Sequence, residues 1–194
     1  MASKTQKLLA GAASVPVLVA GLWVGGDPLL QALSRWERPA HETGASVVYA
    51  DKLAGGLPTV CGGHTDWSLR VGTAYSKADC DKIDRANSAK YALAIIECTG
   101  HTDTNRVLNQ HMLDGLTLFS INVGIAGACG SRAVKLIKAG KASEGCKAIA
   151  NGPYGEPVWS YVNKTTFVRG LYNRRQFERD WCLKPMPTTE RATA

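Results

Sequence analysis

The stretch ETGASVVYADKLAGGLPTVCGGHTD, residues 42–66, decides the fold of this chain. Two short runs that contain β-branched residues, Val47–Tyr49 and Thr59–Cys61, lie on either side of a bend that contains glycine and proline. Extended runs separated by turn-forming residues are typical of a β-hairpin. The stretch therefore predicts a small β-sheet.

The sequence on both sides of this sheet is predicted to be helical. Before it, the Asp-Pro pair at 27–28 is typical of a helix N-terminus, and we expect a helix over 28–37. After it, Ser76 and Asp79 form a variant of the capping box and begin a helical stretch to about residue 98, with a break near Asn87. Further helices are expected over 104–113, 115–122, 131–139, 142–150 and 166–182. The fold class is therefore α+β, with a small sheet inserted early in a mostly helical chain.

The last of these helices, 166–182, is predicted to be amphipathic. Phe177 and Trp181 are spaced i, i+4, and Val168 and Leu171 lie on a similar side, so the arginines are expected to face solvent. Elsewhere, Asp103 and Asp114 are interpreted as capping or surface residues.

An uncharged segment, LLAGAASVPVLVAGLWVGG, occupies residues 8–26 after Lys4 and Lys7. Its length suits a transmembrane helix, but its glycines, its alanines and Pro16 make insertion marginal. Four interpretations of this segment stay open: a cleaved signal peptide, a permanent anchor, a buried core helix, and a weak anchor that can leave the bilayer. We favour the weak anchor. In each membrane interpretation the two lysines keep the N-terminus in the cytoplasm and send the following residues outward.

The composition indicates one exported globular domain. Of the 194 residues, 45% are hydrophobic and 20% charged, which excludes a disordered chain. The net charge of +7 favours a polyanionic partner, and because no basic stripe with interleaved aromatic residues is present, we expect no nucleic-acid partner. All six cysteines follow the apolar segment without a C-x-x-C pair, so two or three disulfides are expected and structural zinc is not. Their pairing stays open among Cys61, Cys80, Cys98, Cys129, Cys146 and Cys182.

Glu42, Asp51 and Thr59 form the candidate catalytic set. Glycoside hydrolysis requires one protonated carboxyl group that donates to the leaving oxygen and one ionised carboxylate that activates water or stabilises the cationic sugar. A threonine hydroxyl can hold a water because it both donates and accepts hydrogen bonds. The spacing of two acids and a threonine around one hairpin is compatible with this chemistry.

The segments HETG, VYAD and PTVCGGHTD resemble the phage-type lysozymes, or endolysins, of glycoside hydrolase family 24. The family signature is Glu, eight residues, Asp or Cys, five residues, Thr and a G-H-T-like turn. Here seven residues separate Asp51 from Thr59, and we place the additional two in the glycine bend. Further on, FSINVGIAGACGSRAVKLIKAG resembles the family's F-N-V-G segment, and TTFVRGLYNRRQFERDWCL its R-G-L-x-x-R-R ending.

The resemblance, which covers about residues 35–185, implies a lysozyme-like muramidase. It implies hydrolysis of the β-1,4 bond between N-acetylmuramic acid and N-acetylglucosamine in peptidoglycan, during phage-induced lysis of the host cell. Glu42 would be the general acid, Asp51 the second carboxylate and Thr59 the water holder, and Asn122 would face bound sugar. No metal or other cofactor is implied, a monomer is expected, and the stereochemical outcome stays open.

A subgroup of these endolysins carries a signal-anchor-release segment, which implies three parts: the anchor at 1–33, the catalytic domain at 34–185 and a polar tail at 186–194. The protein would be tethered in the host inner membrane, with the catalytic domain in the periplasm, and later become soluble there. Some members block themselves with a cysteine inside the anchor, which this chain lacks. Only 15 residues separate Gly26 from Glu42, so we expect the embedded anchor to misplace the acid until residues 8–38 refold against the domain.

Two other functions stay open. A lytic transglycosylase would need an acid but no second carboxylate, and its products would carry a 1,6-anhydro ring. A non-catalytic, membrane-anchored peptidoglycan-binding protein would bind without turnover. Whether the N-terminus is cleaved also stays open.

Overall fold

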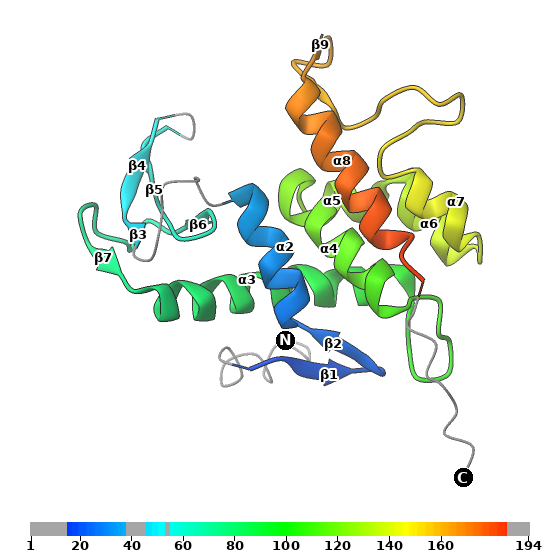
Figure 1. Ribbon diagram of the computed structural model, residues 1–194, viewed down its shortest axis with the longest axis horizontal. Coiled ribbons are helices and arrows are strands. Elements are labelled where there is room, and N and C mark those ends of the chain that lie inside the picture. The colour runs from blue at the N-terminus through cyan, green and yellow to red at the C-terminus, as the bar shows by residue number, and fades with distance from the viewer. Residues whose placement is uncertain (1–14, 38–45, 53–54, 186–194) are drawn as a thin grey trace. The chain divides into compact units, whose positions relative to one another are not determined.

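The computed structural model describes residues 15–37, 46–52 and 55–185, which form seven helices and nine short strands (Figure 1). The chain divides into two compact units, with the boundary in the long helix after Tyr91. Unit 1 comprises the residues up to Val19 and Trp23–Tyr91, and unit 2 comprises Ala20–Leu22 and the residues from Ala92 onward.

The predicted small sheet is present in unit 1. Strands β4, β5 and β6 form a three-stranded antiparallel sheet, β3 pairs with β7, and β1 pairs with β2. The elements are β1 (Val17–Val19), β2 (Leu22–Val24), α2 (Asp27–Glu37), β3 (Ser46–Val47), β4 (Tyr49–Asp51), β5 (Leu57–Val60), β6 (His64–Thr65), β7 (Ala74–Tyr75) and α3 (Lys77–Thr99).

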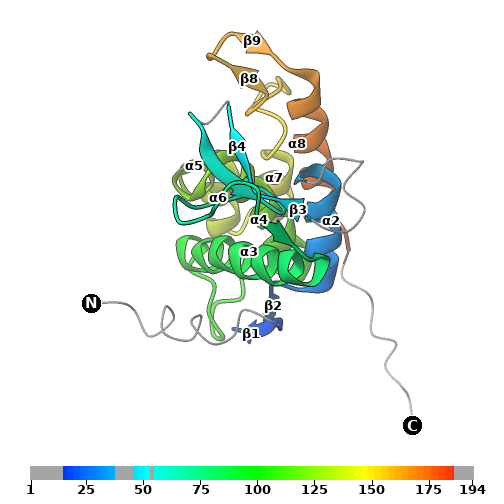
Figure 2. The same cartoon turned by 90° about the vertical axis from the view of Figure 1, so that its left-hand side faces the viewer.

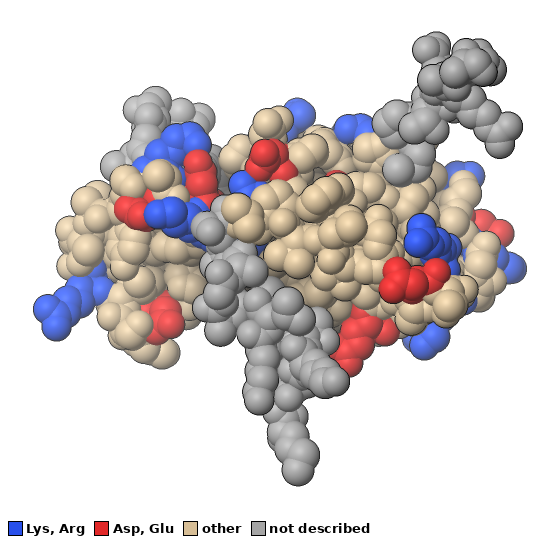
Figure 3. Space-filling model, turned by 90° about the horizontal axis from the view of Figure 1, so that it is seen from below, with Lys and Arg blue, Asp and Glu red and all other residues tan. Residues whose placement is uncertain are grey.

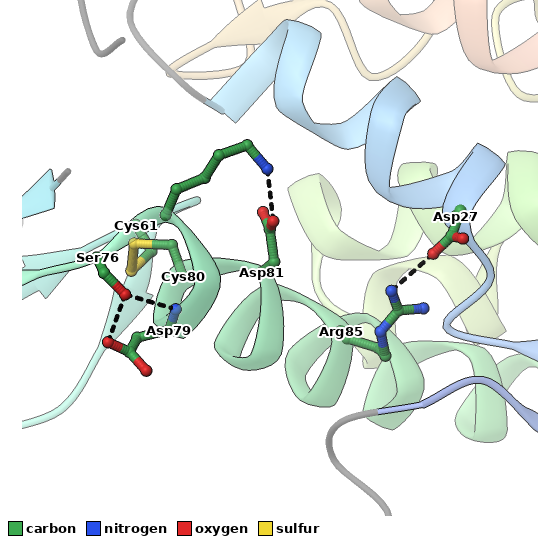
Figure 4. Close-up of polar contacts among 8 residues, drawn as sticks. Asp27, Cys61, Ser76, Asp79, Cys80, Asp81 and Arg85 are labelled. Carbon is green, nitrogen blue, oxygen red and sulfur yellow. Dashed lines mark hydrogen bonds and ion pairs between the residues drawn. A yellow bond between two sulfur atoms is a disulfide. The ribbon is translucent and has the colours of Figure 1, made fainter. Parts of the chain in front are cut away.

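A disulfide between Cys61 and Cys80 joins the end of β5 to the first turn of α3 (Figure 4). It belongs to a buried cluster with Val48 and Val60. The predicted capping box lies beside it: the Ser76 hydroxyl donates to the Asp79 carboxylate at 2.6 Å and accepts from the Asp79 N–H at 3.2 Å. These contacts fix where the sheet ends and α3 begins.

Helix α3 is continuous, so the break expected near Asn87 is wrong. Asparagine and serine are weak helix formers, but the Ser88 hydroxyl donates to the Arg85 carbonyl inside the helix at 3.0 Å. Ser88, Ala89 and Ala92 are also buried, so tertiary packing outweighs local propensity here.

Part of the predicted anchor segment is not helical in this structure. Residues 17–24 form β1 and β2, joined by Ala20 and Gly21, which both have positive φ angles of 48° and 77°. Two left-handed residues give a turn whose twist suits a β-hairpin. Leu22 and Val24 are buried, whereas Leu18 and Trp23 are exposed. Among the described residues no helix is both long enough and apolar enough to cross a membrane.

Unit 2 is mostly helical. Helix α4 packs on α8 and on α5, and α6 packs on α7. The β8–β9 hairpin extends beyond the N-terminal end of α8 (Figures 1 and 2). The elements after α3 are α4 (Gln110–Val123), α5 (Ile125–Gly130), α6 (Arg132–Lys138), α7 (Ala142–Lys147), β8 (Tyr161–Val162), β9 (Thr166–Phe167) and α8 (Arg169–Cys182).

Three predicted boundaries in unit 2 are wrong, of which the simplest is the end of the helix expected over 142–150: α7 stops at Lys147. The helices expected over 104–113 and 115–122 are one helix that starts at Gln110, because Asn109 caps it by accepting from the Met112 N–H at 2.9 Å. The helix expected from residue 166 starts at Arg169, because Thr166 and Phe167 pair with β8.

All six cysteines form disulfides, as the sequence predicted, and the pairing is now defined. Besides Cys61–Cys80, the bridges are Cys98–Cys129 and Cys146–Cys182, both in unit 2. The second of these joins α7 to the end of α8. Gly115 makes the α4–α8 crossing close: a Cβ there would lie 2.8 Å from the Glu178 carbonyl oxygen and from the Cys182 Cβ.

Candidate functional site

Asp51 and Thr59 lie on one face of the β4–β5 hairpin. Tyr49 pairs with Thr59, and Asp51 pairs with Leu57. Directly opposed residues share a face of a sheet, and so do residues two apart on one strand. Asp51 and Thr59 are therefore diagonal neighbours, a relationship in which Cα atoms lie about 7–8 Å apart.

The two additional residues between Asp51 and Thr59 leave this pairing intact. The Gly56 N–H donates to the Asp51 carbonyl at 2.7 Å and closes the loop between the strands. Gly55 and Gly56 have positive φ angles of 69° and 85°, and no atom lies within 4 Å of a Cβ built on either. The additional length is thus accommodated in the loop.

Thr59 is buried, whereas Asp51 is half-buried. The Thr59 hydroxyl donates to the Leu57 carbonyl at 3.0 Å. Since that bond uses its only hydrogen, the oxygen keeps its lone pairs for accepting a further hydrogen bond. Thr59 can therefore hold a water by accepting from it.

The turn after β5 is fixed against α3 within unit 1. Asp84, which is buried, accepts from the Gly62 N–H at 3.0 Å, and a Cβ at Gly62 would lie 2.8 Å from the same carboxylate oxygen. Glycine at this position lets the turn approach the helix. The turn and the disulfide together hold β5, and with it Thr59, in place.

Glu42, the predicted general acid, lies outside the described residues. The structure describes the chain up to Glu37 in α2 and again from Ser46 in β3. The role of Glu42 therefore stays a prediction.

Asn122, the predicted sugar contact, lies in the last turn of α4 in unit 2 and is exposed. Its Oδ1 accepts from Arg175 Nη2 at 2.9 Å. Arg175 is fully buried, and the same Nη2 donates to Glu178 Oε1 at 2.8 Å. Arg174 Nε donates to that Glu178 oxygen at 3.0 Å.

The expectation that the arginines of the last helix face solvent is therefore wrong for Arg174 and Arg175. Both are buried, and both pair with Glu178, one turn further along α8, whose single negative charge offsets part of theirs inside unit 2. The i, i+3 and i, i+4 spacing of these residues was the signal in the sequence that could have identified the cluster.

Asp114 is also buried, so its interpretation as a cap or surface residue is wrong. It lies within α4, and Gln110 Nε2 donates to its Oδ1 at 2.8 Å. Burial raises the pKa of its carboxyl to about 6, although the hydrogen bond from Gln110 lowers it. Asp103, in contrast, is exposed as expected.

A family model described as phage lysozyme matches residues 40–178. The chain belongs to the phage lysozyme family. It is 29% identical to the SAR-endolysin of Pseudomonas phage phiKMV over 150 residues. The matched stretch covers 75% of this chain and 83% of that protein. It is 27% identical to the SAR-endolysin of Enterobacteria phage P21 over 131 residues. That stretch covers 66% of this chain and 70% of the P21 protein.

A solved structure supports the same fold. The muramidase domain of SpmX from Asticaccaulis excentricus has a TM-score of 0.65 and 22% identity, over 82% of this chain and 97% of that one. The lysozyme-like α+β fold is thus confirmed. The phage lysozyme described here is a peptidoglycan hydrolase of the endolysin type, and its substrate is peptidoglycan.

In this phage lysozyme Arg85 holds the residues between β2 and α2, all within unit 1. One guanidinium nitrogen, Nη1, donates to the Gly25 carbonyl, and the other, Nη2, contacts Asp27 Oδ1 at 2.6 Å (Figure 4). Gly25 has a φ of 70°, and a Cβ there would lie 3.0 Å from Arg85 Cγ. The start of α2 is thereby fixed to α3.

A second contact holds the turn between β1 and β2, within unit 2. The Leu108 N–H donates to Nδ1 of the buried His101 at 3.0 Å. Nδ1 therefore carries no hydrogen, so Nε2 carries it and donates to the Ala20 carbonyl at 3.1 Å. The His101 hydrogen bond thus gives the turn between β1 and β2 a defined place in unit 2.

The surface of this phage lysozyme carries both signs of charge. On the face seen in Figure 3, Lys and Arg side chains are interspersed with Asp and Glu. Charges of opposite sign therefore lie close together on this face.

Proposed function

We propose that this phage lysozyme is a muramidase that hydrolyses the β-1,4 bond between N-acetylmuramic acid and N-acetylglucosamine. Glu42 is the general acid, Asp51 the second carboxylate and Thr59 the residue that holds the attacking water. The observation that carries the proposal is the position of Asp51 and Thr59 on one face of the β4–β5 hairpin.

The chemistry follows from the hydrogen-bonding capacity of these two side chains. An ionised Asp51 accepts one hydrogen of a water, and Thr59, whose own hydrogen is donated to Leu57, accepts the other. The lone pair of that water is then free to attack the anomeric carbon while Glu42 protonates the leaving oxygen. A water activated in this way attacks directly, so the proposal predicts inversion at the anomeric carbon.

The test is digestion of purified peptidoglycan by the full chain and by Glu42→Gln and Asp51→Asn. Glu42→Gln removes the transferable proton and is expected to reduce turnover by at least about 10³-fold; Asp51→Asn is expected to reduce it by about 10²-fold. Matched controls are Glu97→Gln and Asp103→Asn, which change exposed acids and should retain full turnover. Circular dichroism establishes that all four variants fold.

The products distinguish the proposal from its rivals. Reducing N-acetylmuramic acid ends that depend on both acids support it. Full activity of Asp51→Asn together with 1,6-anhydro ends would instead indicate a lytic transglycosylase. Binding of peptidoglycan without any turnover would indicate a non-catalytic protein.

We also propose that residues 8–26 tether the protein in the host inner membrane, with the N-terminus in the cytoplasm, before it is released into the periplasm. Two named relatives are SAR-endolysins, which supports a signal-anchor-release route. The contacts of Arg85 and His101 with residues 20–27 support it further, since a segment that leaves the bilayer needs a place in the soluble fold. The released form would then be the one in which the catalytic set is complete.

This part is tested by making the anchor more apolar. Changing Gly11, Ala12 and Ala13 to leucine should hold the protein in the membrane fraction, because each leucine favours insertion. The locked variant is expected to cleave peptidoglycan at least about tenfold more slowly than the soluble protein. Equal rates for the two forms would contradict activation by release.

A further inference from the structure

A cavity of about 540 Å³ lies in unit 2, with walls from α6, α7 and α8. Its volume is within the range of small-molecule sites. The charged side chains on its walls are three cations, Arg132, Lys147 and Arg179, and two acids, Glu144 and Asp180. The cavity therefore has an excess of one positive charge, and the distribution of that charge decides what it can bind.

The chain brings Arg132 and Lys147 to the same end of a helix pair. Helices α6 and α7 pack against each other (Figure 1) and are joined by only three residues, 139–141. A connection this short makes the two helices antiparallel, so the start of α6 lies beside the end of α7. Arg132 is the first residue of α6, and Lys147 is the last residue of α7.

A disulfide brings Arg179 to the same place. Cys146, the residue before Lys147, is bonded to Cys182, with the two Cα atoms 5.5 Å apart. Arg179 precedes Cys182 by three residues on α8, so the two side chains are neighbours on the helix surface. The three cations are thus held together by a helix pair and a covalent link.

Two of these cations have no acidic partner. Asp180 Oδ1 accepts from Arg179 Nε and contacts Arg179 Nη2, both at 2.8 Å, so Asp180 offsets the charge of Arg179. Among the residues that the structure describes, neither Arg132 nor Lys147 forms an ion pair with any carboxylate, Glu144 included. Two like charges that share one cavity repel each other, and a bound anion would relieve that repulsion.

We propose that Arg132, Lys147 and Arg179 form a binding site for one phosphate group that carries two negative charges, either free phosphate or a phosphate monoester. Two negative charges match the two cations that lack a partner, whereas a single carboxylate would balance only one of them. Arginine offers a phosphate two parallel N–H donors, and lysine adds a compact charge. The site goes beyond the proposed function, since the cleavage of glycan does not require it.

The first experiment is calorimetric titration of the full chain with inorganic phosphate at about pH 8, where phosphate carries two charges, with chloride keeping the ionic strength constant. We expect a single saturable site. Arg132→Gln and Lys147→Gln should each weaken binding by about tenfold, the effect of losing one charge-assisted contact.

Matched controls come from the same helix pair. Lys138 ends α6 and Lys141 precedes α7, so both lie at the opposite end of the pair, and both are exposed. Lys138→Gln and Lys141→Gln remove the same charge from the protein as the test variants do. They should leave phosphate binding within about twofold of the wild type, since their distance screens them from the site. Circular dichroism establishes that all variants fold.

Removing the acids should have the opposite effect. Asp180→Asn frees the Arg179 guanidinium for the ligand, and Glu144→Gln removes a negative charge from the wall of the cavity. Both acids are exposed, so the variants should fold. Each should tighten phosphate binding by about threefold or more, because the repulsion of the ligand decreases. A merely structural role of the charged side chains would not produce tighter binding.

Two further probes identify the source of the phosphate. One is glycerol 3-phosphate, and the other is sedimentation with phosphatidylcholine vesicles that contain phosphatidic acid. Retention on these vesicles that Arg132→Gln and Lys147→Gln abolish would support the site and identify a lipid headgroup. Binding of glycerol 3-phosphate without retention on vesicles would support the site and identify a soluble phosphate compound.

The absence of saturable phosphate binding in the wild type would overturn the proposal. Equal weakening in the Lys138→Gln and Lys141→Gln controls would also overturn it, since binding would then follow net charge alone. None of these measurements uses peptidoglycan, so their outcome is independent of the proposed function.

Discussion

Single residues carry the chemistry of this fold, and their surroundings decide what each can do. Thr59 donates its hydrogen to Leu57 and can only accept from water, and Asn122 presents its hydrogens because Arg175 occupies its oxygen. Asp114 shows the opposite case, a carboxyl that burial keeps away from solvent. Of these three environments, that of Asp114 has a direct consequence for stability.

Asp114→Asn should change how stability depends on pH. The pKa of Asp114 is raised from 3.8 to about 6 in the folded protein, so the folded state binds the proton more tightly than the unfolded chain. The free energy of unfolding should therefore fall as pH rises from about 4 to about 6, by at most about 3 kcal/mol, and this fall should be absent in the variant. Urea unfolding at several pH values measures it.

The difference between wild type and variant isolates this group. Burial lowers the pKa of His111 from its ordinary value of 6.5, so His111 contributes the opposite slope as pH falls below that value in both proteins. Parallel curves for the two proteins from pH 4 to pH 6 would contradict a buried, hard-to-ionise Asp114.

Helices and strands position these residues through a few close contacts. The α4–α8 crossing depends on Gly115, the start of α2 depends on Arg85, and the β5–α3 connection depends on the Cys61–Cys80 disulfide. Each contact joins elements distant in sequence. Each can be removed by one or two substitutions.

Gly115→Ala should destabilise the protein by about 1–3 kcal/mol. The added methyl group would lie 2.8 Å from the Glu178 carbonyl oxygen and from the Cys182 Cβ, so the two helices must separate. Thermal unfolding measures the loss. Gly170→Ala, where no atom lies within 4 Å of the added Cβ, is the control, and an equal melting temperature for both variants would argue against a tight crossing.

Arg85→Met should loosen residues 17–27 without unfolding the rest. The variant loses the contacts with Gly25 and Asp27, so amide hydrogens of this segment should exchange about tenfold faster. Lys90→Met, an exposed change on the same helix, is the control. Unchanged exchange in Arg85→Met would mean that Arg85 does not hold the segment.

At the scale of the whole molecule, the disulfides determine the cysteine pairing, which the sequence alone leaves open. Three disulfides, one in unit 1 and two in unit 2, resolve the pairing that spacing alone could not. They fit an exported protein, because disulfides persist in oxidising compartments such as the periplasm.

Replacing Cys61 and Cys80 together by serine should lower the free energy of unfolding by about 3 kcal/mol. The bridge closes a loop between residues 19 apart, and its removal restores the entropy of that loop to the unfolded chain. Denaturant unfolding of the variant measures the loss. A change below about 1 kcal/mol would mean that the packing of Val48 and Val60 suffices without the bridge.

The parts of this architecture that local chemistry dictates could be predicted from the sequence. Ser76 and Asp79 lie three residues apart and cap α3, and the runs around the glycine bend pair as β4 and β5. The spacing of Arg174, Arg175 and Glu178 indicates that they can pair, but the contact of Arg175 with Asn122 could not be foreseen from local spacing, because Asn122 lies 53 positions away. The β1–β2 hairpin was missed because valine, leucine and glycine suit both a marginal membrane segment and a buried strand.

The most direct test of the central claim is digestion of purified peptidoglycan in water enriched in ¹⁸O. Our account predicts that the full chain places one ¹⁸O atom on each new reducing N-acetylmuramic acid end, in the inverted α configuration at the earliest times, and that Glu42→Gln does not. Products ending in 1,6-anhydro sugar without ¹⁸O, or label on N-acetylglucosamine ends, would contradict hydrolysis of this bond by Glu42, Asp51 and a water held at Thr59.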